Sequence, residues 1–160
     1  KKFGSSTIVT NIETIRINNK YYISKSNGRD IVNINPVSWA KKIQDYGSGE
    51  IFITCVNNEG LQSGFDINII GKISKNVNIP VIAHGGAGKF EHVLKVINET
   101  NISGVSLSGL FHYSIFNKFD FKSKNIGNIS FLENNKNAKI KDNLKELKNF
   151  LHKKKVKVRI

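Results

Sequence analysis

The sequence predicts an α/β fold in which helices cover a parallel β-sheet. Segments of strand type alternate with segments of helix type along the chain, and most of the strand-type segments are near-continuous apolar runs. Such runs are typical of parallel strands, because the strands of a parallel sheet are buried on both faces. Polar residues and glycines gather after these strands, where α/β proteins place their active sites. The pattern is sufficient for a small open sheet or for half of an eightfold (β/α) barrel.

The first part of the chain predicts a strand followed by a short hairpin. Thr7–Glu13 reads as the strand, and Ile15–Asn18 and Tyr21–Ser24 read as the two arms of the hairpin. The turn between these arms is expected at residues 19–20. The polar segment Ser26–Asp30 then predicts a loop.

The middle of the chain predicts a helix, a buried strand and a second helix. Pro36 stands at the favoured first position of a helix, which Gly47 ends. Glu50–Val56 is an apolar strand, followed by the polar, glycine-punctuated loop 57–64. Asp66 is a suitable N-cap for the helix that follows, because its carboxylate can accept backbone N–H groups.

The last part of the chain continues the alternation and then interrupts it. Pro80–Ala83 and Ile102–Ser108 predict strands, separated by a helix over Lys89–Asn98. Residues 117–140 are rich in Asn and Lys, and we expect an insertion or a long loop there. An amphipathic helix follows over Lys141–Lys154.

Composition bounds the possible functions. The chain has 160 residues, which is long enough for one domain with its own core. Its formal net charge of +13 makes an anionic partner possible. The Lys residues are scattered rather than gathered with aromatic residues on one face, so we do not expect a nucleic-acid partner. The chain contains no Met, and we expect a processed chain or a fragment of a longer reading frame.

The single cysteine, Cys55, excludes a disulfide framework and lies in an apolar run, so we expect a buried core residue. No Cys/His spacing predicts a metal site, and no cofactor is expected. No apolar stretch approaches the roughly 20 residues of a membrane span. The sequence thus favours a soluble protein of the reducing cytoplasm, without a membrane partner.

The most informative segment is residues 79–89, where an apolar strand stops at a glycine cluster and a helix follows. Glycines at such a turn let backbone N–H groups approach an anion, and the dipole of the following helix favours negative charge there. The segment therefore predicts a phosphate cradle around Gly85 and Gly86. A tight turn without a ligand is the alternative.

Six strings, in this order, resemble the C-terminal half of the cyclase subunit family of imidazole-glycerol-phosphate synthase. They are FGSSTIVTNIE, WAKKIQDYGSGEIFIT, EGLQSGFD, IPVIAHGGAGKFEH, LFHY and ELKNFLHKKKVKVR. The resemblance covers residues 3–116 and 141–160. It implies that residues 1–160 form a single partial (β/α)8 TIM-type barrel domain, which holds strands five to eight and lacks the N-terminal half.

The resemblance also implies the chemistry. Members of this family take ammonia from a glutaminase partner subunit, with which they form a heterodimer. They convert a phosphorylated nucleotide into imidazole glycerol phosphate and an aminoimidazole carboxamide ribonucleotide, a lyase-type cyclisation in histidine biosynthesis. One of the two catalytic carboxylates would lie in the absent half. We therefore expect the chain alone to be inactive and to self-associate through its open strand edges and apolar inner face.

Site residues follow from the resemblance position by position. Glu13 matches a catalytic aspartate, with one methylene more, and a carboxylate there can act as general acid or base. Glu50 matches a charged residue at the gate through which ammonia enters the barrel. The residues matching substrate or phosphate contacts are Thr54, Glu59, Gly60, Gly85, Gly86, Ser108 and Gly109.

Four positions depart from the family pattern. His84 stands where the family has serine, and it could bind phosphate as a cation, act as an acid, or be a tolerated change. Asn57 replaces an aspartate and Leu61 a threonine, in addition to the exchange at Glu13. These changes favour a drifted substrate, so the alternatives are a paralogue that supplies ammonia for amidating surface sugars and a non-catalytic half-barrel that binds a phosphorylated ligand. His92 and His112 we interpret as structural, because no carboxylate or cysteine stands at ligand spacing.

Overall fold

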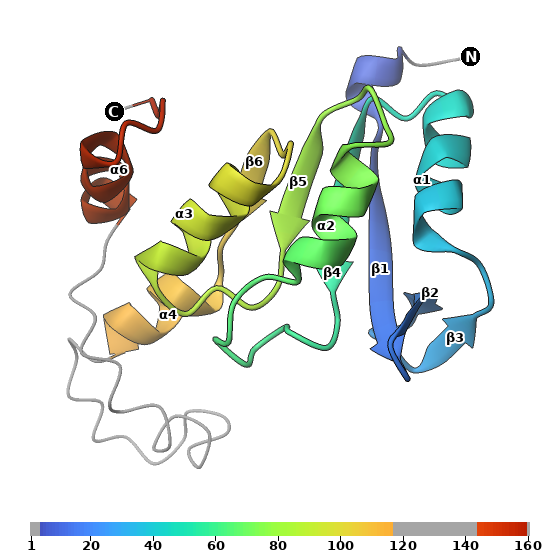
Figure 1. The fold of residues 1–160 in the computed structure, drawn as a ribbon, viewed down its shortest axis with the longest axis horizontal. Helices are drawn as coiled ribbons and strands as arrows, with labels where there is room; N and C mark the ends of the chain where they lie inside the picture. Colours follow the sequence, from blue (N-terminus) through green and yellow to red (C-terminus); the bar gives the residue numbers. More distant parts are fainter. Residues whose placement is uncertain (1–3, 117–143, 160) are drawn as a thin grey trace. The chain divides into compact units, whose positions relative to one another are not determined.

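The structure is a computed structural model that describes residues 4–116 and 144–159 (Figure 1). The chain divides into two compact units, Lys1–Ser106 and Leu107–Ile160. The first unit holds η1 (Ser5–Thr7), β1 (Val9–Ile17), β2 (Lys20–Lys25), β3 (Asp30–Val32), α1 (Pro36–Asp45), β4 (Glu50–Cys55), α2 (Ile67–Ser74), β5 (Val81–His84), α3 (Phe90–Glu99) and β6 (Gly104–Ser106).

The second unit holds α4 (Gly109–Phe116) and α6 (Leu144–Lys153). The expected insertion over residues 117–140 lies outside the described residues, as does the expected start of the last helix. Within the two described ranges, no helix is long and apolar enough to cross a membrane.

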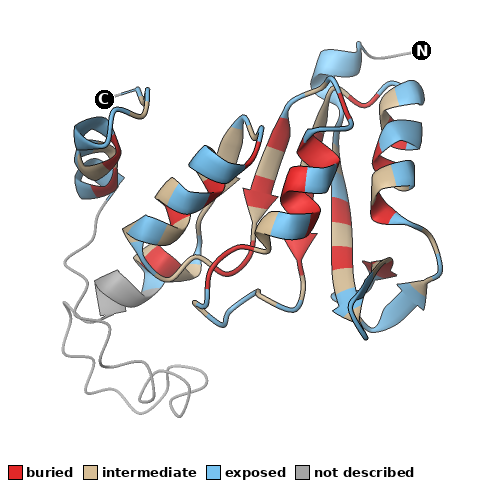
Figure 2. Cartoon of the chain, in the orientation of Figure 1, coloured by how far each residue is buried: buried red, intermediate tan, exposed pale blue. Residues whose placement is uncertain are grey.

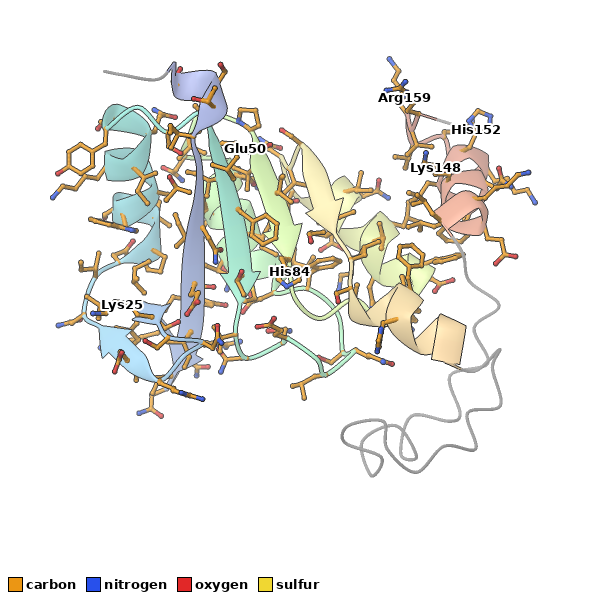
Figure 3. All side chains as sticks on the ribbon, turned by 180° about the vertical axis from the view of Figure 1, so that it is seen from behind. Lys25, Glu50, His84, Lys148, His152 and Arg159 are labelled. Carbon is orange, nitrogen blue, oxygen red and sulfur yellow. The ribbon has the colours of Figure 1, made fainter. Side chains whose placement is uncertain are left out.

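The sheet has six strands in the order β3-β2-β1-β4-β5-β6. β1, β4, β5 and β6 are parallel neighbours, whereas β2 and β3 form an antiparallel hairpin beside the carboxyl end of β1. Each parallel strand is added beyond the previous one without a reversal of order. Helices α1, α2 and α3 all lie on the same face (Figures 1 and 3). A doubly wound open sheet reverses its strand order and carries helices on both faces, so this winding agrees with a (β/α) barrel.

The core lies between the sheet and these three helices, as the buried residues in Figure 2 indicate. Alternate residues of the central strands point toward the helices and are at most 1% exposed: Ile12, Ile51, Ile53, Val81 and Ala83. Full burial of each aliphatic side chain contributes roughly 1.5–3 kcal/mol. The expectation that Cys55 is a buried core residue is confirmed, since this residue is 2% exposed.

The opposite face of the sheet carries none of the first unit's helices. Its residues alternate with the core residues along each strand. Asn11, Glu13, Phe52 and Ile82 keep partial or full exposure, whereas Thr54 is buried. Polar side chains lie on this face where the strands end, near the β–α loops. The face of the sheet that the helices leave uncovered therefore also holds the candidate site.

Local capping signals are confirmed in the structure. The Asp66 side chain accepts the N–H of Ile69 and caps α2, and Pro36 begins α1 behind the Asn35 N-cap. The predicted strand ends shift by one or two residues at several places. β4 ends one residue early, and β6 is confined to Gly104–Ser106.

The hairpin region differs from the prediction. Val9–Ile17 is one continuous strand rather than a strand followed by a separate arm. The turn consists of Asn18 and Asn19, both with positive φ, so it is one residue earlier than expected. This backbone geometry is that of a two-residue hairpin turn, for which asparagine is well suited. The short strand β3 was not predicted, because three residues carry too little periodicity.

Candidate functional site

Four side chains form one row across the carboxyl ends of the parallel strands. Glu13 is in register with Thr54, Thr54 with His84, and His84 with Ser106. Residues in register project from the same face of a sheet, and neighbouring strands are about 4.8 Å apart. The row therefore places a carboxylate, a hydroxyl and an imidazole within roughly 10 Å on the face that the helices leave open.

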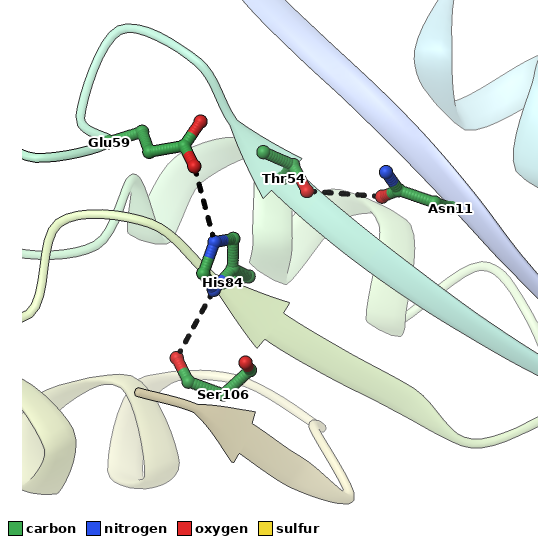
Figure 4. Close-up of polar contacts among 5 residues, drawn as sticks. All are labelled: Asn11, Thr54, Glu59, His84 and Ser106. Atoms are coloured by element: carbon green, nitrogen blue, oxygen red, sulfur yellow. Dashed lines mark hydrogen bonds and ion pairs between the residues drawn. The ribbon is translucent and has the colours of Figure 1, made fainter. Parts of the chain in front are cut away.

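His84 is the best-supported member of this row (Figure 4). Its Nε2 lies 3.5 Å from Oε1 of Glu59, and its Nδ1 lies 3.4 Å from the carbonyl oxygen of Ser106. The ring also packs against Phe52 with centroids 5.3 Å apart. The His84 side chain is 19% exposed and that of Glu59 is 50% exposed, so the imidazole is held in place while the carboxylate faces solvent.

Thr54 is 7% exposed, and its hydroxyl donates to Oδ1 of Asn11 at 3.0 Å (Figure 4). This bond fixes the hydroxyl rotor and leaves the oxygen's lone pairs as acceptors. Thr54 thus joins the middle of the row to β1 and orients the amide of Asn11.

Glu13 is reached by the loop between β2 and β3. The Gly28 N–H donates to Oε2 of Glu13 at 3.4 Å. A Cβ on Gly28 would lie 2.6 Å from the Val56 side chain, so this loop approaches the strand ends closely. A cavity of about 500 Å³ adjoins Glu13 and is lined in part by Asn11, Ser24 and Trp39.

The glycine loop after β5 has the backbone of an anion site. Gly85 and Gly86 have φ of 96° and 103°, a region that other residues rarely adopt. Successive backbone N–H groups in such a conformation form a concave nest for an anion. Among the described residues, no acceptor takes the N–H of Gly86 or of Ala87, so both remain available to a ligand or water.

This loop is locked to the loop after β4. The Gly64 N–H donates to the carbonyl oxygen of Gly86 at 2.7 Å, and the Asn58 amide donates to the carbonyl oxygen of Gly64 at 2.8 Å. A Cβ on Gly86 would meet the Gly64 backbone and the Asn58 side chain. Only glycine fits there, for reasons of both φ and space.

His92 supports the same loop from helix α3. Its Nδ1 accepts the N–H of Gly88 at 3.2 Å, which requires the neutral ring. Burial, followed by the Lys89 charge, lowers the pKa of His92 below its usual value, and this shift favours the neutral form. The contacts of His92 agree with its interpretation as structural.

Comparison with known proteins identifies the family. The family model described as histidine biosynthesis protein matches residues 1–117. The chain belongs to the histidine biosynthesis protein family. It is 40% identical over 121 residues to the imidazole glycerol phosphate synthase subunit HisF of Sulfolobus acidocaldarius, a match that covers 76% of the chain and 48% of that protein.

Two further relatives bear the same name. The HisF subunit of Hydrogenobaculum sp. is 40% identical over 71% of the chain and 45% of its own length, and that of Saccharolobus solfataricus is 34% identical over 77% and 49%. The chain thus spans about half the length of these relatives. The resemblance drawn from the six strings is confirmed at the level of the family.

The structure of this family member brings together only part of the predicted set. Glu13, Thr54, Glu59, His84, Gly85 and Gly86 gather at the carboxyl ends of the strands. Gly60 lies in the Glu59 loop with a φ of 75° and open space around it. Glu50 is the first residue of β4. It lies at the amino end of that strand, at the opposite edge of the sheet from His84 (Figure 3).

Ser108 and Gly109 belong to the second unit. The carbonyl oxygen of Ser108 accepts the N–H groups of Phe111 and His112 at 3.2 and 3.0 Å, so this residue begins the first turn of α4. Small residues at the start of a helix are compatible with phosphate binding, and their assignment to the site stays a prediction.

Two contributors to the site were missed from the sequence. Asn11 is a polar residue at an alternate position of an otherwise apolar strand, and this period of two could have identified it. The sequence marks Asn57 only as the replacement of an aspartate, but its amide oxygen accepts the N–H of Arg16 at 2.6 Å and its NH2 group donates to the Arg16 carbonyl oxygen at 3.3 Å. An aspartate could make only the first of these two bonds.

Proposed function

We propose that this chain is part of the cyclase subunit of an imidazole glycerol phosphate synthase. In this role it uses ammonia to form imidazole glycerol phosphate and an aminoimidazole carboxamide ribonucleotide in histidine biosynthesis. The observation that carries the proposal is the row Glu13–Thr54–His84 beside the free N–H groups of the glycine loop. The names of its relatives support the same reaction.

We also propose that the chain forms the C-terminal half of a (β/α)8 barrel. The strand order advances in one direction and the first unit's helices lie on one face, as in a barrel segment. The chain spans about half the length of its relatives, which is the length that half a barrel requires.

In the proposed reaction, Glu13 transfers protons to and from the substrate. A positioned carboxylate contributes by general acid–base catalysis when it lies within hydrogen-bond reach of the reacting group. The Gly28 N–H holds one carboxylate oxygen and leaves the other for substrate.

A substrate phosphate binds the glycine loop in this proposal. Gly85 and Gly86 supply the nest, and Gly60 supplies a further backbone contact. Thr54 orients the substrate through its lone pairs. No group of three His, Cys, Asp or Glu side chains suited to a metal occurs among the described residues, and the proposed steps use none.

The partner in the proposed synthase is a glutaminase subunit at the amino ends of the strands. Glu50 lies at that end of β4 and serves there as part of the ammonia gate (Figure 3). Ammonia then enters at the amino ends of the strands, and the substrate phosphate binds at their carboxyl ends, so the glutaminase and the substrate do not compete for the same surface of the barrel.

The half-barrel proposal predicts that the isolated 160-residue chain self-associates. Residues of the open face stay exposed, as Val9 does at 55%, and among the described residues no further strand pairs with the outer edge of β6. Sedimentation velocity should find dimers or larger species at micromolar concentration. A monodisperse monomer that unfolds cooperatively would contradict the half-barrel proposal.

Complementation tests the proposed function in cells. The protein that carries this chain is expressed in a bacterial strain that lacks its own HisF subunit, and growth without histidine is scored. The proposal expects growth, and loss of growth for the Glu13→Gln variant at equal expression. Failure to grow with well-expressed, folded protein would reject the histidine-pathway assignment.

A further inference from the structure

The contact between Glu59 and His84 has an unusual consequence for an anion site. The glycine loop and His84 offer N–H donors to a negative ligand, yet a carboxylate already lies 3.5 Å from the outer ring nitrogen of His84. Glu59 is thus an anion that the chain itself supplies. It contacts Nε2 of His84, beside the glycine loop.

The two partners differ in how firmly they are held. His84 is fixed by its backbone position in β5, by the Phe52 ring and by the Ser106 carbonyl oxygen. The Glu59 side chain makes only the contact with His84 among the described residues, and it is 50% exposed. The imidazole therefore has a fixed place, whereas the carboxylate can turn into solvent at small cost.

We propose that Glu59 is a displaceable internal anion, which a substrate phosphate replaces on Nε2 of His84. This inference rests on the proposed phosphate-binding role of the glycine loop and changes the role of Glu59. Rather than contacting the phosphate, Glu59 occupies part of its place until the phosphate arrives. His84 then becomes a phosphate ligand together with the N–H groups of Gly86 and Ala87.

The displacement sets the strength and the selectivity of binding. A phosphate must overcome both the contact of Glu59 with His84, which is an ion pair when the imidazole is protonated, and the repulsion from the nearby carboxylate, so weakly charged ligands do not enter. Removing the Glu59 charge removes both obstacles. The strength typical of a half-exposed ion pair predicts that phosphate binds about two- to five-fold more tightly to Glu59→Gln.

The test is a titration of the protein that carries this chain with inorganic phosphate, followed by the NMR amide signals of Gly86 and Ala87. We expect saturable shifts in the native chain, a lower dissociation constant for Glu59→Gln and a higher one for His84→Phe, which keeps a ring without an N–H donor. Glu99→Gln is the matched control, because it removes the same charge from an exposed position at the far end of α3. It should leave the dissociation constant within about two-fold.

A double variant separates displacement from general repulsion. In the His84→Phe background, which keeps a ring but has no N–H donor, the further change Glu59→Gln should tighten binding less than it does in the native chain, because only the repulsion is left to remove. Equal tightening in both backgrounds would overturn the inference. So would weaker binding to Glu59→Gln than to the native chain, which would make Glu59 a supporting contact.

These outcomes differ from failure of the proposed function. If the native chain and all variants leave the Gly86 and Ala87 signals unshifted, the loop binds no phosphate and both proposals fall. If the native chain binds phosphate but the Glu59 variant does not tighten, only the displacement is wrong.

Discussion

The substitution Gly86→Ala tests the close approach of the two loops at the candidate site. Gly86 has a φ of 103°, where a residue with a Cβ is strained by about 1–3 kcal/mol. Its Cβ would lie 2.8 Å from the Gly64 carbonyl carbon and 2.9 Å from the Asn58 Cβ. Both neighbours are held by hydrogen bonds, so relief of the clash would lengthen bonds that each contribute about 1 kcal/mol.

We therefore expect Gly86→Ala to lower the free energy of unfolding by about 3–5 kcal/mol, a large part of the 5–15 kcal/mol typical of a domain. The assay is urea unfolding followed by far-ultraviolet circular dichroism. Gly47→Ala is the matched control, because Gly47 has a φ of 97° but no heavy atom within 4 Å of the added Cβ.

The control should lose only the conformational contribution, about 1–2 kcal/mol. The difference between the two variants then measures the contact between the loops. If Gly86→Ala destabilises the chain no more than Gly47→Ala does, the loops are not locked together as described, and the geometry of the phosphate nest loses its support.

Three further predictions follow from individual contacts. Asn57→Asp should lower the free energy of unfolding by about 0.5–1.5 kcal/mol in urea titrations, because the bond donated to the Arg16 carbonyl oxygen is lost; an unchanged midpoint would contradict this role. The lowered pKa of His92 predicts a stability contribution that is complete above about pH 6.5 and is lost as the pH falls through the lowered value, so melting temperatures of the native chain should drop more than those of His92→Gln between about pH 7.5 and about pH 5. Burial raises the pKa of Cys55 to about 12, so a disulfide reagent should modify this thiol only after unfolding, and rapid modification of the native chain would refute its burial.

Most of the fold could be predicted because its signals are local. Proline at the first position of α1, aspartate at the N-cap of α2 and the apolar runs of β4 and β5 each determine their element through nearby backbone groups. The hairpin was less predictable, since a single residue decides whether Asn18–Asn19 or the next pair forms the turn. Pairing with β4 also includes Glu13 and Thr14, so β1 continues where the sequence predicts a break. The paired segments lie about 40 residues apart in sequence, so no local pattern reveals this pairing.

The candidate site was predictable in its residues but not in its contacts. Glycines with positive φ are marked by residue type, so Gly85 and Gly86 could be assigned before the structure. The contact of Glu59 with His84 depends on the register of two strands and on the path of a loop. The bidentate role of Asn57 likewise depends on where β1 continues beyond Glu13, which no local pattern specifies.

Turnover by the protein that carries this chain measures the proposed reaction directly. The protein is mixed with the phosphoribulosyl-formimino aminoimidazole carboxamide nucleotide and an ammonium salt, and imidazole glycerol phosphate is quantified. We expect ammonium-dependent product that falls at least about 100-fold in Glu13→Gln, the usual scale of acid–base catalysis. Absence of product from the native protein, or equal rates in both proteins, would contradict the assignment of Glu13 and of the reaction.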